Sequence, residues 1–193
     1  MILLRKKSIQ ITLALLLIFW GVLIYSNAFH SAFQFDDHRY ILKNDALKKL
    51  SNFQQHVFYD WNYRKRIVAF WTFALNYHFH QDDVFGYHLV NIAIHILNTL
   101  LVWRFVLLVF FSPLGSTYQQ GVSERKKYIV AIFSALIFLA HPIQTQAVTY
   151  ISQRFTLLAA FFYLIGLYLY MKGRFFIRRP GQRIKEVFYF LGI

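Results

Sequence analysis

The sequence predicts an all-α membrane protein with about four transmembrane helices, the start of a fifth, and amphipathic helices in a long first outer loop. Three observations lead to this fold class. Of the 193 residues, 58% are hydrophobic and only 15% are charged, which is too little charge for the surface of a soluble domain. The apolar residues form long blocks, and the Lys and Arg residues stand mainly at the ends of those blocks, as around membrane spans.

The composition argues against nucleic-acid binding and against cysteine-based chemistry. The net charge of +13 would suit a nucleic-acid-binding protein, but the position of the cations beside apolar blocks favours membrane topology instead. The chain has no cysteine, which excludes a disulfide framework, a thiolate metal site and a cysteine nucleophile.

The first predicted span covers residues 9–25 and follows three cations at positions 5–7. Seventeen residues rising about 1.5 Å each nearly cross a bilayer core of roughly 30 Å. A cleaved signal peptide is the alternative, because residues 26–28 read Ser-Asn-Ala, like a cleavage site. The apolar block is longer than the usual signal core of about 7–15 residues, so we expect an uncleaved anchor.

Residues 26–86 form a polar, aromatic-rich outer loop that contains six of the eight acidic residues. Within this loop, residues 67–79 are apolar, but 13 residues are too few to span a bilayer. This segment predicts an interfacial or re-entrant helix.

The remaining predicted spans cover residues 87–111, 128–147 and 155–171, and Pro142 ends or kinks the third of them. A further apolar stretch begins at residue 187 and is the expected start of a fifth span. We therefore expect the 193 residues to form a single membrane region that is truncated.

The charges also orient the spans. Segments 1–8, 112–127 and 172–186 hold 3, 3 and 6 Lys or Arg residues and only two acids between them. Short basic segments stay in the cytoplasm. Residues 26–86 and 141–154 are therefore predicted to lie on the non-cytoplasmic side.

Adjacent carboxylates at Asp36 and Asp37 are the first candidate catalytic group. Two neighbouring acids beside an apolar boundary repel each other, which favours a raised pKa in one of them and suits a general base for a hydroxyl. The alternative is that the pair caps a helix over residues 39–50.

The second predicted span carries a polar stripe at spacings of three and four residues, which places its members on one helix face. The stripe consists of His88, Asn91, His95 and Asn98. Such side chains face the bundle interior, where they either join helices or line a polar cavity. A shared metal ion is not expected, because two turns separate the two histidines by roughly 10 Å.

A third polar cluster lies between the third and fourth predicted spans. It includes His141, Gln146 and Arg154. An arginine at the membrane entry of a span binds a phosphate bidentately or anchors the helix among the headgroups.

Taken in order, these clusters resemble one family. The motifs are F-x-F-D-D-x-x-x-I-x-x-N (33–44), L-N-Y (75–77), F-G-Y-H-L-V-N-I-x-x-H (85–95), H-P-I-Q-T-Q-A-V-T-Y-I-S-Q-R (141–154) and L-A-A-F-F-Y-L (158–164). They are similar to the N-terminal membrane half of the transmembrane-and-tetratricopeptide-repeat glycosyltransferases. These are GT-C-type enzymes related to the protein O-mannosyltransferases.

The resemblance implies transfer of mannose or another hexose from a polyprenyl-phosphate carrier to a hydroxyl acceptor on a protein or glycan, on the non-cytoplasmic face. It implies Asp36 or Asp37 as the catalytic base, with Asp36 favoured by alignment. Arg154, His141 and His88 would bind the carrier phosphate. Asn91, His95 and Gln146 would line the cavity. No cofactor or metal is implied, although a divalent cation stays open.

Departures from the family pattern support a second function class. Gln146 stands where the family has a glutamate, and the tetratricopeptide repeats are absent from the sequence. The alternative function is therefore a non-catalytic membrane scaffold or an inactive fragment of such an enzyme. A transporter would need broken paired spans and mid-membrane charge, which the sequence does not show. The run at residues 153–156 resembles bacterial members, so we expect the bacterial inner membrane, or the endoplasmic reticulum in a eukaryote.

Overall fold

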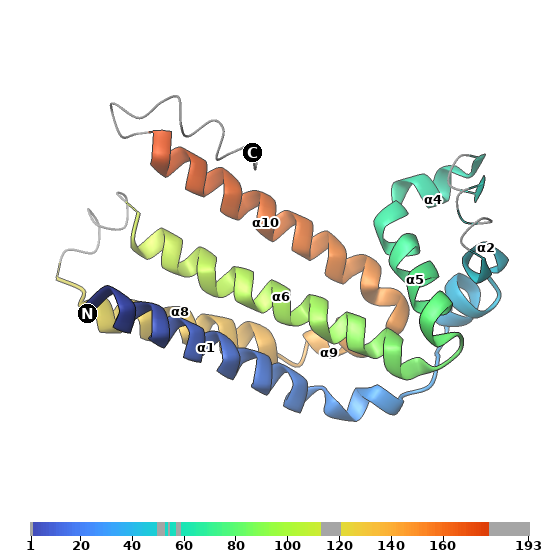
Figure 1. The fold of residues 1–193 in the computed structure, drawn as a ribbon, viewed down its shortest axis with the longest axis horizontal. Coiled ribbons are helices and arrows are strands. Elements are labelled where there is room, and N and C mark those ends of the chain that lie inside the picture. Colours follow the sequence, from blue (N-terminus) through green and yellow to red (C-terminus); the bar gives the residue numbers. More distant parts are fainter. Residues whose placement is uncertain (1, 50–52, 54, 57–58, 113–120, 178–193) are drawn as a thin grey trace.

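The computed structural model describes residues 2–49, 53, 55–56, 59–112 and 121–177, and this part of the chain is helical with no strand (Figure 1). The all-α prediction is therefore confirmed. The long helices are α1 (Ile2–Ile24), α6 (Val84–Phe110), α8 (Glu124–Ala140) and α10 (Arg154–Ile177). The shorter elements are η1 (Ser26–His30), the π-helical turn η2 (His38–Leu42), α2 (Asp45–Lys48), α4 (Trp61–Lys65), α5 (Ile67–His80), α9 (Gln144–Thr149) and η3 (Ile151–Gln153).

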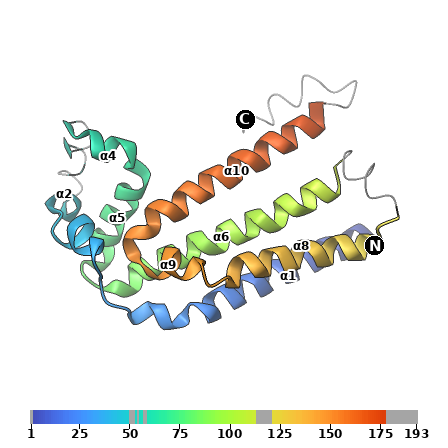
Figure 2. The same cartoon turned by 180° about the vertical axis from the view of Figure 1, so that it is seen from behind.

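The four long helices form an elongated bundle in which α6 packs against α1, α8 and α10 (Figures 1 and 2). At one end of the bundle lie α2, α4 and α5, and we call this the loop end, while α9 lies beside the neighbouring part of α6. At the opposite end lie the N-termini of α1 and α8 and the C-termini of α6 and α10, and we call this the basic end.

Local sequence sets where the long helices begin and end. The Asp83 carboxylate accepts the Phe85 N–H at 3.0 Å and caps α6, and the Ser123 hydroxyl caps α8. Helix α8 ends at Ala140, because Pro142 disfavours helical backbone at His141, which is extended with φ −64° and ψ 128°. The predicted third span, 128–147, is thus not one helix, since α9 follows only after a turn.

Close packing between α1 and its neighbours depends on small residues. A Cβ at Gly21 would lie 2.6 Å from the Ile96 side chain of α6, so the glycine permits a close approach. Farther toward the basic end, Leu17 is buried in one cluster with Ala131 and Ala135 of α8. Methyl-sized side chains allow the two backbones to approach, as in membrane bundles.

Two described helical segments are long and apolar enough to cross a membrane by length and composition, Val84–Phe110 and Ile151–Phe175. The apolar part of α1, Ser8–Ile24, is shorter, and α8 has 17 residues. The predicted count of four spans therefore stays a prediction. The predicted helix at residues 67–79 is found as α5, with nearly the same bounds. The predicted fifth span from residue 187 and the cations at 178–185 lie outside the described residues.

Candidate active site

Residues 31–37, which we call the acid segment, make three hydrogen bonds to the rest of the bundle. The ring nitrogen Nε2 of His88 lies 2.9 Å from the carbonyl oxygen of Ser31. The Asp36 N–H donates to the Tyr150 hydroxyl at 2.9 Å, and the Ser152 N–H donates to Asp37 Oδ1 at 2.7 Å. Helix α6 and the connection between α8 and α10 therefore fix the backbone at Asp36 and the carboxylate of Asp37.

Asp37 is a buried fastening group. Its side chain is 1% exposed, and its second oxygen accepts the Gln34 N–H at 3.0 Å. It makes no capping bond to the turn that follows, and the cap of α2 is Asn44, which accepts from the Ala46 N–H. The pair does stand at the start of helical backbone over residues 36–42, as the alternative expects, but the Asp37 side chain does not cap that turn. Its carboxylate instead joins two segments that are 115 residues apart in the chain.

Asp36, in contrast, is exposed at the surface of the loop end. The residue before it, Phe35, has φ +44° and a side chain that is 83% exposed. A left-handed backbone at a phenylalanine costs roughly 1–3 kcal/mol, and such strain collects at functional sites. The Phe35 ring also packs edge-on against Tyr150, at 6.2 Å between centroids. The local backbone thus presents the Asp36 carboxylate outward.

Arg154 is fully buried between three helices. Its Nε donates to Asn91 Oδ1 at 2.7 Å, Nη1 donates to Asn76 Oδ1 at 2.7 Å, and Nη2 donates to the Tyr87 carbonyl at 2.9 Å. The guanidinium also lies 4.3 Å from the centroid of the Phe73 ring. In the described part of the chain no carboxylate pairs with it. It joins α10 to α5 and α6, so a carrier phosphate reaches it only if these contacts open, and the phosphate role stays a prediction.

The polar stripe of α6 faces the bundle interior, as predicted. The Asn91 amide donates to the carbonyls of Val148, Tyr150 and Ile151 at 3.2–3.4 Å. The Asn98 amide donates to the Leu157 carbonyl at 3.0 Å, and His95 Nε2 lies 3.2 Å from the Leu139 carbonyl. All these polar side chains are fully buried. Their contacts join helices, and the cavity-lining role of Asn91 and His95 stays a prediction.

His141 and Gln146 are both exposed. The Nδ1 atom of His141 accepts the Ile143 N–H at 3.2 Å in the turn that ends α8, and Gln146 lies on the short helix α9. The structure therefore brings Asp36, Asp37 and His88 together around the acid segment and links them through Asn91 to Arg154. The predicted roles of His141 and Gln146 remain predictions.

Four residues that position this site were not singled out from sequence. They are Asn76, Tyr87, Tyr150 and Ser152. Each lies inside one of the five motifs, and that membership was the available signal. Among the described residues, no three His, Cys, Asp or Glu side chains gather as the ligands of a metal ion would.

Comparison with curated proteins finds relatives of one kind. The chain is 28% identical over 186 residues to a protein O-mannosyl-transferase of Caenorhabditis elegans, covering 88% of this chain and 24% of that protein. It is 29% identical over 168 residues to protein O-mannosyl-transferase Tmtc3 of Drosophila melanogaster, covering 79% and 18%. It is 27% identical over 173 residues to human protein O-mannosyl-transferase TMTC4, covering 79% and 22%.

The chain is related to the TMTC-type protein O-mannosyl-transferases. The resemblance inferred from the five motifs is therefore confirmed. The chain spans about a quarter or less of the length of these TMTC-type relatives. No protein-family model matches it, and no solved structure matches it.

Proposed function

We propose that this TMTC-related chain is the membrane region of a glycosyltransferase that transfers a hexose, mannose in the first instance, from a polyprenyl-phosphate carrier to a hydroxyl of a protein or glycan. The observation that carries the proposal is the fastening of the acid segment to the segment that leads into Arg154. The motif at residues 33–44 and the motif at residues 141–154 contact each other there, with the Asp37 carboxylate buried and hydrogen-bonded and the neighbouring Asp36 exposed.

The helices are proposed to cross a membrane four times, with the loop end on the non-cytoplasmic side. The surface of the bundle supports this placement. Along α1, large apolar side chains such as Leu15 (60% exposed) and Phe19 (59%) face outward, and on α10 Tyr163 is 71% exposed. So continuous an apolar surface is unfavourable in water and suits contact with lipid. The cations of α8 lie at the basic end, as the positive-inside rule requires. The proposed location is the bacterial inner membrane.

Asp36 is the proposed catalytic base. The acceptor hydroxyl passes its proton to the Asp36 carboxylate while its oxygen forms a bond to the anomeric carbon of the sugar. The bond from that carbon to the phosphate oxygen breaks, and the polyprenyl phosphate leaves with the electron pair. Asp37 is less suited to this step, because backbone N–H groups already occupy both of its oxygens.

The leaving phosphate is proposed to bind near His141 and Arg154. His141 is exposed in the turn that ends α8, ahead of the segment that holds Asp36 and Asp37. Arg154 lies two residues beyond Ser152, which Asp37 holds. The guanidinium would take part after an opening of α5 that frees it from Asn76.

The experiment compares three charge-removing substitutions in the intact protein. Membranes that contain Asp36→Asn, Asp37→Asn or Asp82→Asn are supplied with radiolabelled polyprenyl-phosphate mannose and a hydroxyl acceptor. Loss of a general base lowers the rate by about 10²–10⁴-fold, and we expect this loss for Asp36→Asn. Asp82 is an exposed carboxylate of the same loop and is the matched control. Full transfer by the Asp36→Asn protein would contradict the assignment.

A non-catalytic scaffold is the second candidate function. The observation in its favour is that Arg154 is buried and already has short bonds to three helix-borne acceptors. Gln146, an exposed amide where the family has a glutamate, points the same way. The scaffold predicts that Asp36→Asn and the unsubstituted protein are equally without transfer, while both insert and fold alike.

A further inference from the structure

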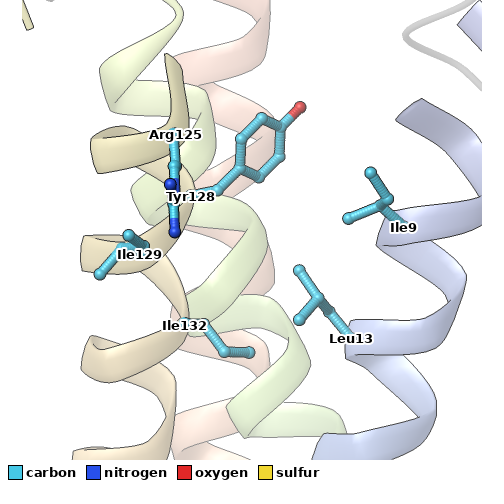
Figure 3. A pocket seen from close by; sticks show the side chains of 6 residues that line it. All are labelled: Ile9, Leu13, Arg125, Tyr128, Ile129 and Ile132. Atoms are coloured by element: carbon cyan, nitrogen blue, oxygen red, sulfur yellow. The ribbon is translucent and has the colours of Figure 1, made fainter. Parts of the chain in front are cut away.

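A cavity of about 290 Å³ lies at the basic end, between α1 and α8 (Figure 3). The helices α2, α4 and α5 lie at the opposite end of the bundle (Figure 1). Six side chains line it: Ile9, Leu13, Arg125, Tyr128, Ile129 and Ile132. Ile9 and Leu13 point from α1 toward α8, while Tyr128 and Ile132 point back toward α1. The only charged group in this lining is the guanidinium of Arg125.

The cavity forms where the two helices no longer pack through small side chains. Ala131 and Ala135 are fully buried, in one cluster with Leu17 of α1. One to two turns nearer the helix N-termini, the facing residues are large. Ile9 and Ile129 remain 49% and 42% exposed there, so the cavity is open to the surroundings of the bundle.

Cations are concentrated on the helices that reach the basic end. Helices α6 and α8 carry four of them, Arg104, Arg125, Lys126 and Lys127, against one acid, Glu124. A polar chain closes one side: Arg104 donates to the Gln10 side-chain oxygen at 3.1 Å, and Gln10 donates to the Tyr128 hydroxyl at 3.3 Å.

Aromatic rings stand beside these cations. Arg104 lies 5.0 Å from the Trp103 ring, and Lys127 lies 5.3 Å from the Phe111 ring. Exposed aromatic side chains beside cations are typical of the level at which lipid headgroups lie, and Phe111 is such a side chain, whereas the Trp103 ring is buried.

We propose that this cavity binds one acyl chain of an anionic glycerophospholipid, with the lipid phosphate on Arg125. An apolar slot with a guanidinium on its rim matches a hydrocarbon chain that ends in a phosphate diester. The acyl chain moves from one apolar environment to another and contributes little net free energy. Selectivity for a net negative lipid therefore comes from Arg125. The inference rests on the membrane placement proposed above and is independent of sugar transfer.

The test measures lipid retention by the full chain in detergent micelles, by native mass spectrometry, with phosphatidylglycerol and phosphatidylcholine as probes. Arg125→Gln removes the cation on the rim, and Lys126→Gln makes the same charge change at an exposed neighbour outside the lining. Ile132→Trp fills the slot, and Ile137→Trp is its control on an exposed part of α8. Melting temperatures of all variants verify folding.

We expect the unsubstituted chain to retain phosphatidylglycerol over phosphatidylcholine. Loss of a charge-assisted contact lowers affinity by about tenfold or more, so Arg125→Gln should lower retention of phosphatidylglycerol by that factor, and Lys126→Gln by less than about threefold. Ile132→Trp should reduce retention of both lipids, and soluble glycerol phosphate should not compete.

Three results would overturn the proposal: equal retention of the two lipids, equal effects of Arg125→Gln and Lys126→Gln, or displacement of the lipid by glycerol phosphate. Equal retention of the two lipids would indicate that no lipid-selective site exists. Equal effects of the two substitutions would indicate attraction to general surface charge. Displacement by glycerol phosphate would indicate a site for free phosphate. Because Arg125 is exposed, we expect Arg125→Gln to fold, so this variant tests the proposal even if Ile132→Trp does not fold. The lipid-retention assay contains no sugar donor, so its result does not depend on whether the protein transfers a sugar.

Discussion

Replacing Arg154 by lysine tests whether the buried guanidinium network holds the loop end together. The substitution keeps the positive charge, so the cost of burying a cation stays largely the same. It removes the planar fork, which in the structure reaches Asn91, Asn76 and the Tyr87 carbonyl at 2.7–2.9 Å on two different helices. A single ammonium on a shorter reach cannot satisfy all three acceptors at once.

The expected magnitude follows from the acceptors left behind. Each buried acceptor without a partner costs about 1–3 kcal/mol, and at least two of the three lose theirs. We therefore expect Arg154→Lys to lower the free energy of unfolding by about 2–5 kcal/mol. On the scale of soluble domains this lowers the melting temperature by roughly 5–15 °C.

The matched control is Arg104→Lys, which makes the same chemical change at an exposed arginine with one bond, to Gln10 at 3.1 Å. It should change stability by less than about 0.5 kcal/mol. Thermal unfolding in detergent, followed by tryptophan fluorescence, measures both; Trp103 is 1% exposed and reports on the bundle interior. Equal melting temperatures for the two variants would refute the network.

Three further predictions follow from particular contacts. Asp37→Ala removes the acceptor of two backbone N–H groups and should lower the free energy of unfolding by about 2–4 kcal/mol. The control Asp36→Ala should change it by less than about 0.5 kcal/mol. Equal melting temperatures of the two variants would contradict the proposed structural role of Asp37. Gly21→Ala should destabilise by about 1–3 kcal/mol through the 2.6 Å contact with Ile96, whereas Gly166→Ala, which meets nothing within 4 Å, should stabilise its helix by up to about 1 kcal/mol; a stabilising Gly21→Ala would contradict the close packing. In this chain without other thiols, a single cysteine at Lys49 should be labelled from outside in intact cells, whereas a single cysteine at Ser123 should not be labelled. The reverse labelling would show that the predicted topology is inverted.

The exposed Asp36 and the buried Asp37 show how one motif can combine two physical roles. Both residues are helical, and successive side chains on a helix point in different directions, so one carboxylate is exposed while the other holds the segment. The strained backbone at Phe35 accompanies this arrangement, because it turns the chain sharply just before the pair.

Sequence patterns were sufficient for the all-α class, for the bounds of α5, and for the inward face of α6. Each depends on local properties: apolar block length, helical periodicity and the cost of a polar group facing lipid. The order of the motifs was likewise sufficient to indicate the TMTC-type relatives, since it needs no coordinates.

Only the tertiary structure decided which of the two carboxylates is buried and where Arg154 points. Adjacent aspartates have identical side chains, and the Ser152 N–H that captures Asp37 lies 115 residues away, so no local pattern distinguishes them. Arg154 begins α10 at a position where a headgroup anchor and a phosphate ligand were equally reasonable from sequence. Its burial follows from acceptors on α5 and α6 that meet only in the packed bundle, where leaving them unpaired would be unfavourable.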